Sequence, residues 1–327
     1  MSPAPYMRVM SVPRTFDDVL VAIQPHPKKR VAVAVAQDDA VLKAVARAEQ
    51  ENVADCVLVG DQEKIRAAAD AVGADISLAE IVHEADTNKA AIKAMAMVSS
   101  GDCHIAMKGK LHTDDFLRAV LDKEVGLRAG RLLSHVFILE IVAKGEQQSR
   151  LLFVTDGAMN IAPNFEEKAQ ICVNAIGLAR LFGIDHPKVA ALAGVELVNP
   201  KMQATQDAAV LALMSYRGQF EVGMVEGPLA MDLAVSEEAA RVKGVKNPVA
   251  GKAEILLMPS LEAGNILVKG FSHLAGGRTA GLVLGAKAPV VLTSRSDTAE
   301  SKFFSIACAV YAADMAAVKV KIGKVRG

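Results

Sequence analysis

The chain has 327 residues, of which 52% are hydrophobic and none is tryptophan, and its formal net charge is +0 at pH 7. This length fits one large domain or two linked domains, and the composition is typical of closely packed α/β layers and not of an aromatic-rich β-sandwich. A chain without net charge has no global field that attracts nucleic acid or an acidic membrane, so local groups must hold any anionic ligand.

The 4 cysteines are scattered singly, without the paired spacing of a metal site: Cys56, Cys103, Cys172 and Cys308. We expect each to be a small buried hydrophobic residue, and the lack of a disulfide framework indicates a reducing compartment. The N-terminus does not resemble a signal peptide, and no apolar stretch reaches a membrane-spanning length. The sequence therefore predicts a soluble, cytoplasmic protein with neither nucleic-acid nor membrane partners.

The first part of the chain alternates predicted helices and strands. After a loose lead we expect a helix over 16–23, a strand over 30–36, a helix from about 40 and a strand over 56–59. Strand, helix and strand in about thirty residues make a βαβ unit with a right-handed crossover. The alternation continues with helices over 87–99 and 114–121 and with strands over 104–107 and 136–139.

The second part continues this pattern with longer elements. A strand over 151–155 ends in a polar turn, and Asn164 begins an amphipathic helix that Gly183 closes. We then expect strands over 188–195 and 254–260, helices over 202–218 and 263–276, and a loop at GGRTAG, residues 276–281. The whole pattern predicts an α/β fold with a parallel or mixed sheet, helices on both faces, and two lobes.

The stretch VVLTSRSDTAESKFFSI, residues 290–306, is the strongest candidate for a site. It begins as a buried strand, turns at Thr293 to Arg295, and enters a helix that Asp297 or Thr298 can cap. A helix N-terminus joined by a serine hydroxyl and the guanidinium of Arg295 is suited to a phosphate or another oxyanion. The alternative is a capped helix with a surface arginine.

The common catalytic motifs are absent. GVKNPVAGK, residues 244–252, has the wrong glycine spacing for a phosphate-binding P-loop, and Ala253 follows where Ser or Thr would hold magnesium. GGRTAG lacks the dinucleotide-binding spacing, and no GxSxG motif is present. The 7 histidines form no ligand pair, so we expect no metal site.

Polar residues remain at the ends of predicted strands, where open α/β folds bind ligands. Any one of them could serve only as a cap or a turn. The groups are Lys108, His112 to Asp115 with Arg118, Asp156 to Asn160, Asn265 to Lys269 with His273, and Ser294 to Glu300.

Five strings resemble the phosphate acetyltransferase/phosphate butyryltransferase family: MKGKLHTDDFLRAVL, GLRAGRLLSHVFI, TDGAMNIAPNFEEKAQI, AGKAEILLMPSLEAGNIL and APVVLTSRSDTAESKF. The resemblance covers nearly all of the chain after about Lys29. It is closest to the butyryl type and to the transferase part of enoyl-CoA hydratase/phosphate acetyltransferase proteins. It implies the two-lobed fold of the isocitrate and isopropylmalate dehydrogenases, with the active site between lobes formed by residues 1–133 plus 289–327 and by residues 134–288. It also implies a homodimer or higher homo-oligomer, with the second lobe at the dimer interface.

The implied reaction converts a short-chain acyl-CoA (acetyl or butyryl) and phosphate into an acyl phosphate and CoA by direct thiolate attack, with coenzyme A as a substrate and no cofactor or metal. Ser294 and Arg295 match the pair that binds phosphate in this family, and Arg118 matches another arginine of the cleft. Ser301 stands where acetyl-type members have an Asp proposed to deprotonate the CoA thiol, so the base is open among Asp297, Glu300 and His273. His273 corresponds roughly to a family arginine, with Arg278 close by. The remaining candidates for substrate binding are Lys108, Thr113, Asn265, Asp156 and Asn160.

Two other functions remain open at this point. A metal-dependent decarboxylating dehydrogenase would share the implied fold, but it needs clustered aspartates and a nucleotide loop, which the sequence lacks. A non-catalytic protein that binds CoA or acyl phosphate would be consistent with the missing Asp.

Overall fold

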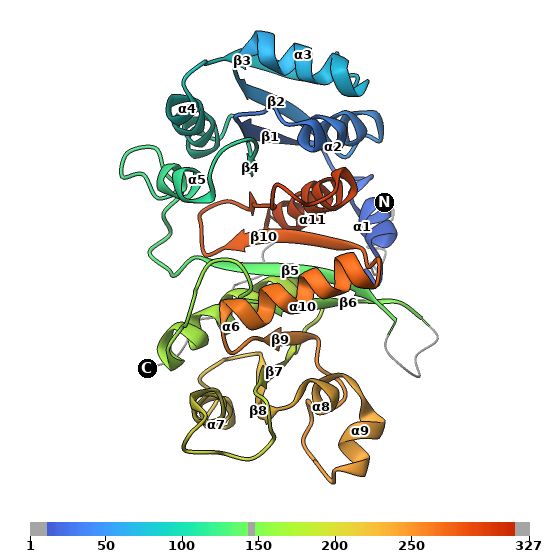
Figure 1. Cartoon of the computed structure of the whole chain (residues 1–327), viewed down its shortest axis with the longest axis vertical. Helices are drawn as coiled ribbons and strands as arrows, with labels where there is room; N and C mark the ends of the chain where they lie inside the picture. The colour runs from blue at the N-terminus through green and yellow to red at the C-terminus, as the bar shows by residue number, and fades with distance from the viewer. Residues whose placement is uncertain (1–11, 143–147, 318–327) are drawn as a thin grey trace, which may run out of the picture.

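A computed structural model of the chain describes residues 12–142 and 148–317. It contains one 11-stranded sheet in the order β3-β2-β1-β4-β11-β10-β5-β6-β9-β7-β8, which extends along the longest axis of the molecule (Figure 1). The strands are β1 Lys29–Ala34, β2 Ala54–Gly60, β3 Glu80–His83, β4 Ile105–Lys108, β5 Ser134–Ile141, β6 Arg150–Thr155, β7 Lys188–Leu192, β8 Met224–Leu229, β9 Ile255–Leu257, β10 Thr279–Leu284 and β11 Val290–Val291.

Eleven helices cover this sheet in the described residues. They are α1 Phe16–Ile23, α2 Asp39–Gln50, α3 Gln62–Val72, α4 Thr87–Ser100, α5 Thr113–Val120, α6 Phe165–Leu181, α7 Gln203–Tyr216, α8 Met231–Val235, α9 Glu237–Val242, α10 Leu261–Leu274 and α11 Ala299–Ala317. Several begin at the predicted caps: the side chain of Asn164 accepts a hydrogen bond from the N–H of Glu167, and Thr15 caps α1 in the same way.

The centre of the sheet is antiparallel and its two halves are parallel. β10 pairs antiparallel with both β11 and β5, and β5 pairs antiparallel with β6, whereas all the other pairings are parallel. One half of the sheet comes from residues before 109 and after 289, and it consists of β3, β2, β1, β4 and β11. The other half comes from residues 134–284, and it consists of β10, β5, β6, β9, β7 and β8. The predicted α/β fold with a mixed sheet is confirmed, and the lobe boundaries stay a prediction.

The antiparallel centre reverses the strand direction within the site. Three antiparallel pairings separate β11 from β6, so the carboxyl ends of these two strands point in opposite directions. The register nevertheless places Val291 of β11 level with Thr155 of β6, through Leu282 and Val136, so the turns that follow the two strands begin at the same level of the sheet. Helix α10 starts after β9 and runs back across the sheet (Figure 1).

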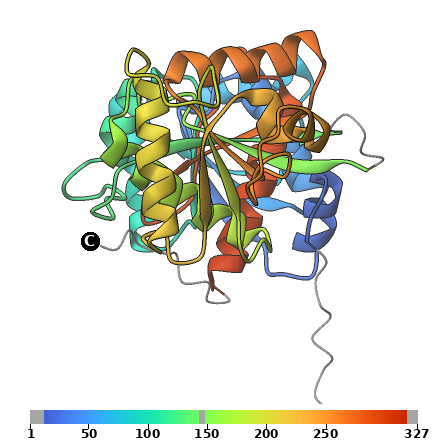
Figure 2. The same ribbon diagram turned by 90° about the horizontal axis from the view of Figure 1, so that it is seen from below.

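The two faces of the sheet are covered differently. On one face a single hydrophobic cluster runs through both halves and includes buried residues of α1, α2, α6 and α11. On the other face there are two separate clusters, one with α4 and α5 and one with α8, α9 and α10. Figure 2 shows the helices on both sides of the sheet from below. A cavity lies between these two clusters, lined in part by residues of β5 and β10 and by residues that follow β11.

The stretch 276–281, for which the sequence predicts a loop, contains the start of a strand. β10 begins at Thr279, and Gly281 lies within it. All 4 cysteines are buried, as expected. Within the described ranges no helix is both long and apolar enough to cross a bilayer. The first residues of the predicted lead, 1–11, lie outside the described part of the chain.

Candidate active site

A cavity of about 180 Å³ lies between the two helix groups on the divided face. Its wall includes Thr113 of α5, Asn265 of α10, and Ser294 and Asp297 of the loop between β11 and α11. The structure thus brings together four of the residues predicted from the sequence, although they are up to 184 positions apart, from 113 to 297. His135 and Phe137 of β5 complete the wall beneath them.

The loop that carries Ser294 and Arg295 is fixed by its own hydrogen bonds. Asp297 Oδ2 accepts from the N–H of Ser294 at 2.7 Å, and Thr298 Oγ1 accepts from the N–H of Ser301 at 3.1 Å, as a helix cap does. Both predicted capping candidates are used, Thr298 for α11 and Asp297 for the turn. Arg295 Nη2 donates to His112 Nδ1 at 3.0 Å, so the guanidinium points from the β11–α11 loop towards the start of α5.

Two buried lysines lie behind this loop. Lys302 of α11 is 2% exposed, and its Nζ donates to the carbonyl oxygen of Ser294 at 2.7 Å and to Thr293 Oγ1 at 3.3 Å. Lys108, at the end of β4, is 3% exposed. Burial, reinforced by the charges of Lys302 and Arg295, lowers the pKa of Lys108 to about 8, and burial also lowers the pKa of Lys302. Among the described residues none of these three cations has a carboxylate oxygen within 4.0 Å.

Helix α10 reaches the cavity because two glycines let it lie against the turn after β6. A Cβ atom on Gly264 would lie 2.7 Å from the Cα of Gly157 and 2.8 Å from the carbonyl oxygen of Asp156. Asn265 Nδ2 donates to the carbonyl oxygen of Gly157 at 3.3 Å, which ties the helix to the same turn. This contact sets the position of Asn265 in the wall.

Asp156 and Asn160 organise the turn itself. The buried carboxylate of Asp156 accepts from the N–H groups of His135, Ala158 and Met159 and from Asn160 Nδ2, at distances between 2.6 and 3.0 Å. Asn160 Nδ2 also donates to the carbonyl oxygen of Leu133 at 3.0 Å. Neither residue lines the cavity, whereas Ala158 between them does.

Five other predicted residues do not line the cavity: Arg295 and Lys108, described above, and Arg118, Glu300 and His273. Arg118 of α5 forms an ion pair with Asp115 at 2.6 Å, and 77% of its side chain is exposed. Glu300, in the first turn of α11, and His273, near the end of α10, are both exposed. Arg278 forms ion pairs with Asp17 and Glu140, which bind it to α1 and β5.

Ser301 takes part in a small hydroxyl cluster. Its Oγ lies 3.0 Å from Thr279 Oγ1 and 3.3 Å from Thr298 Oγ1. Thr279 lines the cavity, so this cluster lies beside it.

His135 and Lys302 are the site residues that the sequence did not single out. Both occur in strings that carry the resemblance, but a lone histidine in a strand and a lysine within an apolar helix have no distinguishing spacing. The fully buried His135 donates from Nε2 to the carbonyl oxygen of Leu292 at 3.1 Å. Burial lowers the pKa of this histidine, although the carboxylate of Asp156 opposes the shift, so its ring is neutral at pH 7.

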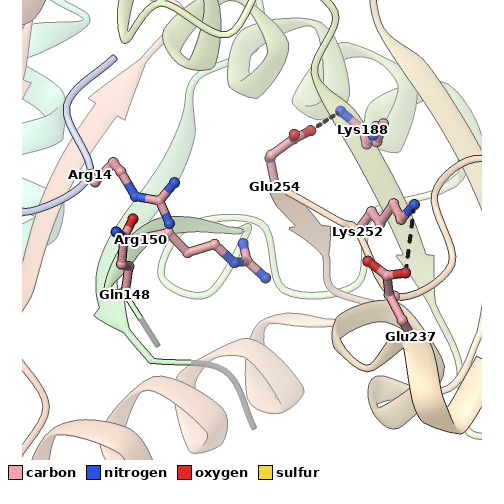
Figure 3. Close-up of a pocket in the computed structure, with 8 residues that line it drawn as sticks. Arg14, Gln148, Arg150, Lys188, Glu237, Lys252 and Glu254 are labelled. Carbon is pink, nitrogen blue, oxygen red and sulfur yellow. Dashed lines mark hydrogen bonds and ion pairs between the residues drawn. The ribbon is translucent and has the colours of Figure 1, made fainter. Parts of the chain in front are cut away.

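A second, larger pocket of about 510 Å³ lies at the amino ends of β6, β7 and β9 (Figure 3). Its charged side chains are largely engaged with the protein. Lys252 pairs with Glu237 at 3.6 Å, Glu254 accepts from the N–H of Lys188, and Arg14 Nε donates to the carbonyl oxygen of Ser149. It shares no lining residue with the smaller cavity. The smaller cavity is the better candidate because the predicted residues converge there.

In the part of the chain that the structure covers, no three side chains of His, Cys, Asp or Glu come together in a way that could hold a metal ion.

The comparisons with known proteins agree over most of the chain. The chain is 47% identical over 300 residues to a phosphate butyryltransferase of Clostridium acetobutylicum, covering 92% of this chain and 98% of that protein. It is 41% identical over 292 residues to a phosphate acetyltransferase of Thermotoga maritima, covering 89% and 98%. A solved branched-chain phosphotransacylase from Enterococcus faecalis V583 superposes with a TM-score of 0.77 and 32% identity, covering 87% of this chain and 99% of that one.

A protein named for a different activity has the same fold. A 4-hydroxythreonine-4-phosphate dehydrogenase from Burkholderia phymatum superposes with a TM-score of 0.52 at 13% identity and shares the fold alone, which confirms the predicted dehydrogenase-like, two-lobed architecture. The model of one family, phosphate acetyl/butaryl transferase, matches residues 15–91 and 84–310. Since this match spans most of the sequence, the chain belongs to the phosphate acetyl/butaryl transferase family.

Proposed function

We propose that this protein is a phosphate acyltransferase, which interconverts an acyl-CoA and phosphate with an acyl phosphate and CoA. Family membership and relatives named for this activity support the proposal. The two alternatives, a decarboxylating dehydrogenase and a non-catalytic CoA-binding protein, are not favoured, because the relatives at 41–47% identity are named as transferases.

The observation that carries the proposal is the group of three cations at the Ser294 loop. Lys108 and Lys302 are buried and Arg295 lies beside them, and no carboxylate in the described residues forms an ion pair with any of the three. Nζ of Lys302 donates to oxygens of Ser294 and Thr293, and Nζ of Lys108 donates to the carbonyl oxygen of Gly109, so only neutral groups bind these buried charges. A bound anion would stabilise both. Phosphate and acyl phosphate are anions of the required kind.

The mechanism follows from this arrangement. We propose that Ser294 and Arg295 hold the phosphoryl group while the CoA thiolate attacks the acyl carbon, and that phosphate leaves with its charge developing beside the guanidinium. Lys302 fixes the carbonyl oxygen of Ser294 and thereby the orientation of the loop. Donors aimed in advance at a developing oxyanion typically contribute about 3–4 kcal/mol each to catalysis. Thr113 and Asn265 are proposed to contact the substrate as well, because they line the same cavity.

The roles of the predicted residues outside the wall are also proposals. Arg118 lies on α5 with an exposed guanidinium, so it is proposed to bind the phosphate groups of CoA or acyl phosphate at the mouth of the space. Asp156 and Asn160 are proposed to support the wall through the turn that positions Gly157, since their polar atoms bind the backbone there.

A short acyl chain, with butyryl preferred over acetyl, is our proposal for the substrate. The cavity wall includes Phe137, Leu261 and Val268, an apolar surface that suits a hydrocarbon chain. The relative at 47% identity is named for butyryl transfer, and a solved relative for branched-chain acyl groups.

One assay tests both parts of this proposal. The thioester absorbance of acetyl-, propionyl- and butyryl-CoA should fall only when phosphate is added, and fastest with butyryl-CoA. An added methylene in an apolar pocket changes rates by about 10–200-fold. Loss of thioester without phosphate would indicate a hydrolase, and no loss at all would contradict the proposed activity.

We further propose a cytoplasmic homodimer. The exposed face of α7 carries Val210, Leu213 and Tyr216, with Tyr216 89% exposed, and the preceding loop adds Leu197 and Val198. Thr205 holds that loop against α7 through hydrogen bonds with Asn199. An apolar patch of this kind is more often an interface than open surface.

A further inference from the structure

Nδ1 of His135 is a buried nitrogen atom without a hydrogen-bond partner, and His135 lines the cavity. Its ring is 0% exposed and packs against Phe137, with ring centroids 4.3 Å apart. Gly281 of β10 makes room for it, since a Cβ there would lie 3.0 Å from Nε2. The residue forms part of the cavity wall together with Ser294 and Asp297.

The hydrogen bond to Leu292 fixes the tautomer of this ring. A backbone carbonyl can only accept, so Nε2 must carry the hydrogen and Nδ1 must present a lone pair. Nδ1 is buried and has no hydrogen-bond partner in the structure. A buried acceptor without a partner costs free energy, and such an atom in the wall of a functional cavity requires an explanation.

The cavity must widen before a ligand can contact this atom. Its volume of about 180 Å³ is below the roughly 300–1,000 Å³ that small-molecule sites usually have. An acyl phosphate and the thiol end of CoA can therefore enter together only if the walls contributed by α10 and by the β11–α11 loop separate. Such a separation would uncover the strand face that carries His135.

The other candidates for the base are less well placed. The carboxylate of Asp297 already accepts from the N–H of Ser294 at 2.7 Å, and Glu300 and His273 are exposed and do not line the cavity. Ser301, at the position where acetyl-type members have an Asp, offers a hydroxyl bound to two other hydroxyls.

We propose that Nδ1 of His135 is the base that accepts the proton of the CoA thiol in the acyl transfer, an inference that rests on the proposed function. The S–H bond breaks as its proton passes to Nδ1, and the sulfur electron pair forms the bond to the acyl carbon. The C–O bond to the phosphoryl group then breaks, and its electron pair leaves on phosphate. The proton passes from Nδ1 to the released phosphate, so the reaction needs no other proton source.

The charged groups that face the ring are suited to this role. Asp156, in the turn after β6, accepts from the N–H of His135 at 3.0 Å, and Asp297 approaches from the β11–α11 loop. Both carboxylates stabilise an imidazolium while it exists. In the resting enzyme, burial keeps the ring neutral and Nδ1 ready to accept a proton.

Two variants separate the roles of the two ring nitrogens. In His135→Gln the side-chain amide can still donate to the carbonyl of Leu292, but nothing replaces the Nδ1 lone pair. We expect this variant to keep its KM for acyl phosphate and its melting temperature, while kcat falls about 10²–10⁴-fold. Its remaining activity should rise with pH up to about 8.5, where the thiol ionises without help. In His135→Asn, which loses the Leu292 bond, both kcat and melting temperature should fall.

The wild-type protein offers a test that does not depend on a variant. Nitrogen-15 NMR of histidine-labelled protein should show His135 as the neutral Nε2–H tautomer at pH 7. An imidazolium, an Nδ1–H tautomer, or a His135→Gln enzyme with at least half of the wild-type kcat would overturn this proposal. If the wild type itself shows no phosphate-dependent thioester loss, the proposed function fails first, so the two failures are distinguishable.

Discussion

The ammonium groups of Lys108 and Lys302 lie in the protein interior beside Arg295, and this concentration of positive charge is the main electrostatic feature of the site. The charges of Lys302 and Arg295 disfavour the charged form of Lys108 in the empty protein, and a bound, doubly charged anion would offset this repulsion. Stability is thus reduced where binding is required, as is common at functional sites.

The lowered pKa of Lys108 makes the folding stability of the protein depend on pH. Its pKa of about 8 in the folded protein lies below the ordinary value of 10.5, so between pH 8 and pH 10.5 the unfolded chain binds more protons. Folding stability attributable to Lys108 therefore increases with pH across this window. The stability advantage of Lys108→Met over wild type should shrink between these limits, by about 3 kcal/mol at most, since one pKa unit corresponds to about 1.4 kcal/mol.

Urea unfolding of both proteins across this pH range measures the difference. Lys43→Met is the matched control, because it makes the same replacement at an exposed position of α2. A stability difference between Lys108→Met and wild type that does not change with pH would show that Lys108 is not held charged in the interior.

At the scale of elements, the position of α10 depends on its contact with the turn after β6. Gly264→Ala would place a methyl group 2.7 Å from the Cα of Gly157, against backbone that cannot easily move. We expect a loss of about 1–3 kcal/mol in unfolding free energy, measured by urea denaturation, together with reduced activity as Asn265 is displaced.

The same helix supplies the control. Gly270 has no atom within 4 Å of where its Cβ would lie, so Gly270→Ala should stabilise the protein by about 0.5–1 kcal/mol through helix propensity. If both variants changed stability in the same direction, the close approach of α10 to Gly157 would not be what positions the helix.

Most elements with strong local signals could be predicted from the sequence. The helix over 16–23 was predicted at its observed bounds, and Asn164 was placed correctly at the start of α6. The elements that were missed have weak signals. β8, with the sequence MVEGPL, contains a glycine and a proline, which a strand tolerates because β8 is at the edge of the sheet. β10 begins within GGRTAG, where Gly281 is required by the ring of His135 and not by a turn.

The site was predictable to the extent that its residues follow strands or match family strings. Ser294, Asp297, Thr113 and Asn265 come together in one cavity wall. His135 and Lys302 could not be found in this way, because their importance comes from tertiary contacts with Leu292 and Ser294 that no local pattern encodes.

At the scale of the whole molecule, the unequal covering of the two sheet faces determines where ligands and partners can bind. One face has a continuous core, whereas the helices on the other face divide into two groups around the cavity. The sheet ends at β8 beside α7 (Figure 1), so the exposed apolar face of α7 lies at one extremity of the molecule.

This arrangement predicts the effect of a charge on α7. Leu213→Glu should halve the molar mass observed by light scattering, because an unpaired carboxylate in an apolar interface costs several kcal/mol. Val21→Glu, at a 73% exposed apolar position of α1, should leave the mass unchanged. A wild-type protein that is monomeric at micromolar concentration would contradict the proposed dimer.

The central claim is that Arg295 and its neighbours hold the phosphate that enters or leaves the acyl group. Its most direct test is the rate of phosphate-dependent thioester loss from butyryl-CoA in wild type, Arg295→Ala and Arg295→Lys. The account predicts that Arg295→Ala lowers kcat by about 10²-fold or more with an unchanged melting temperature, and that Arg295→Lys recovers only part of it, since an ammonium lacks the planar fork. Wild-type turnover in Arg295→Ala would contradict the account.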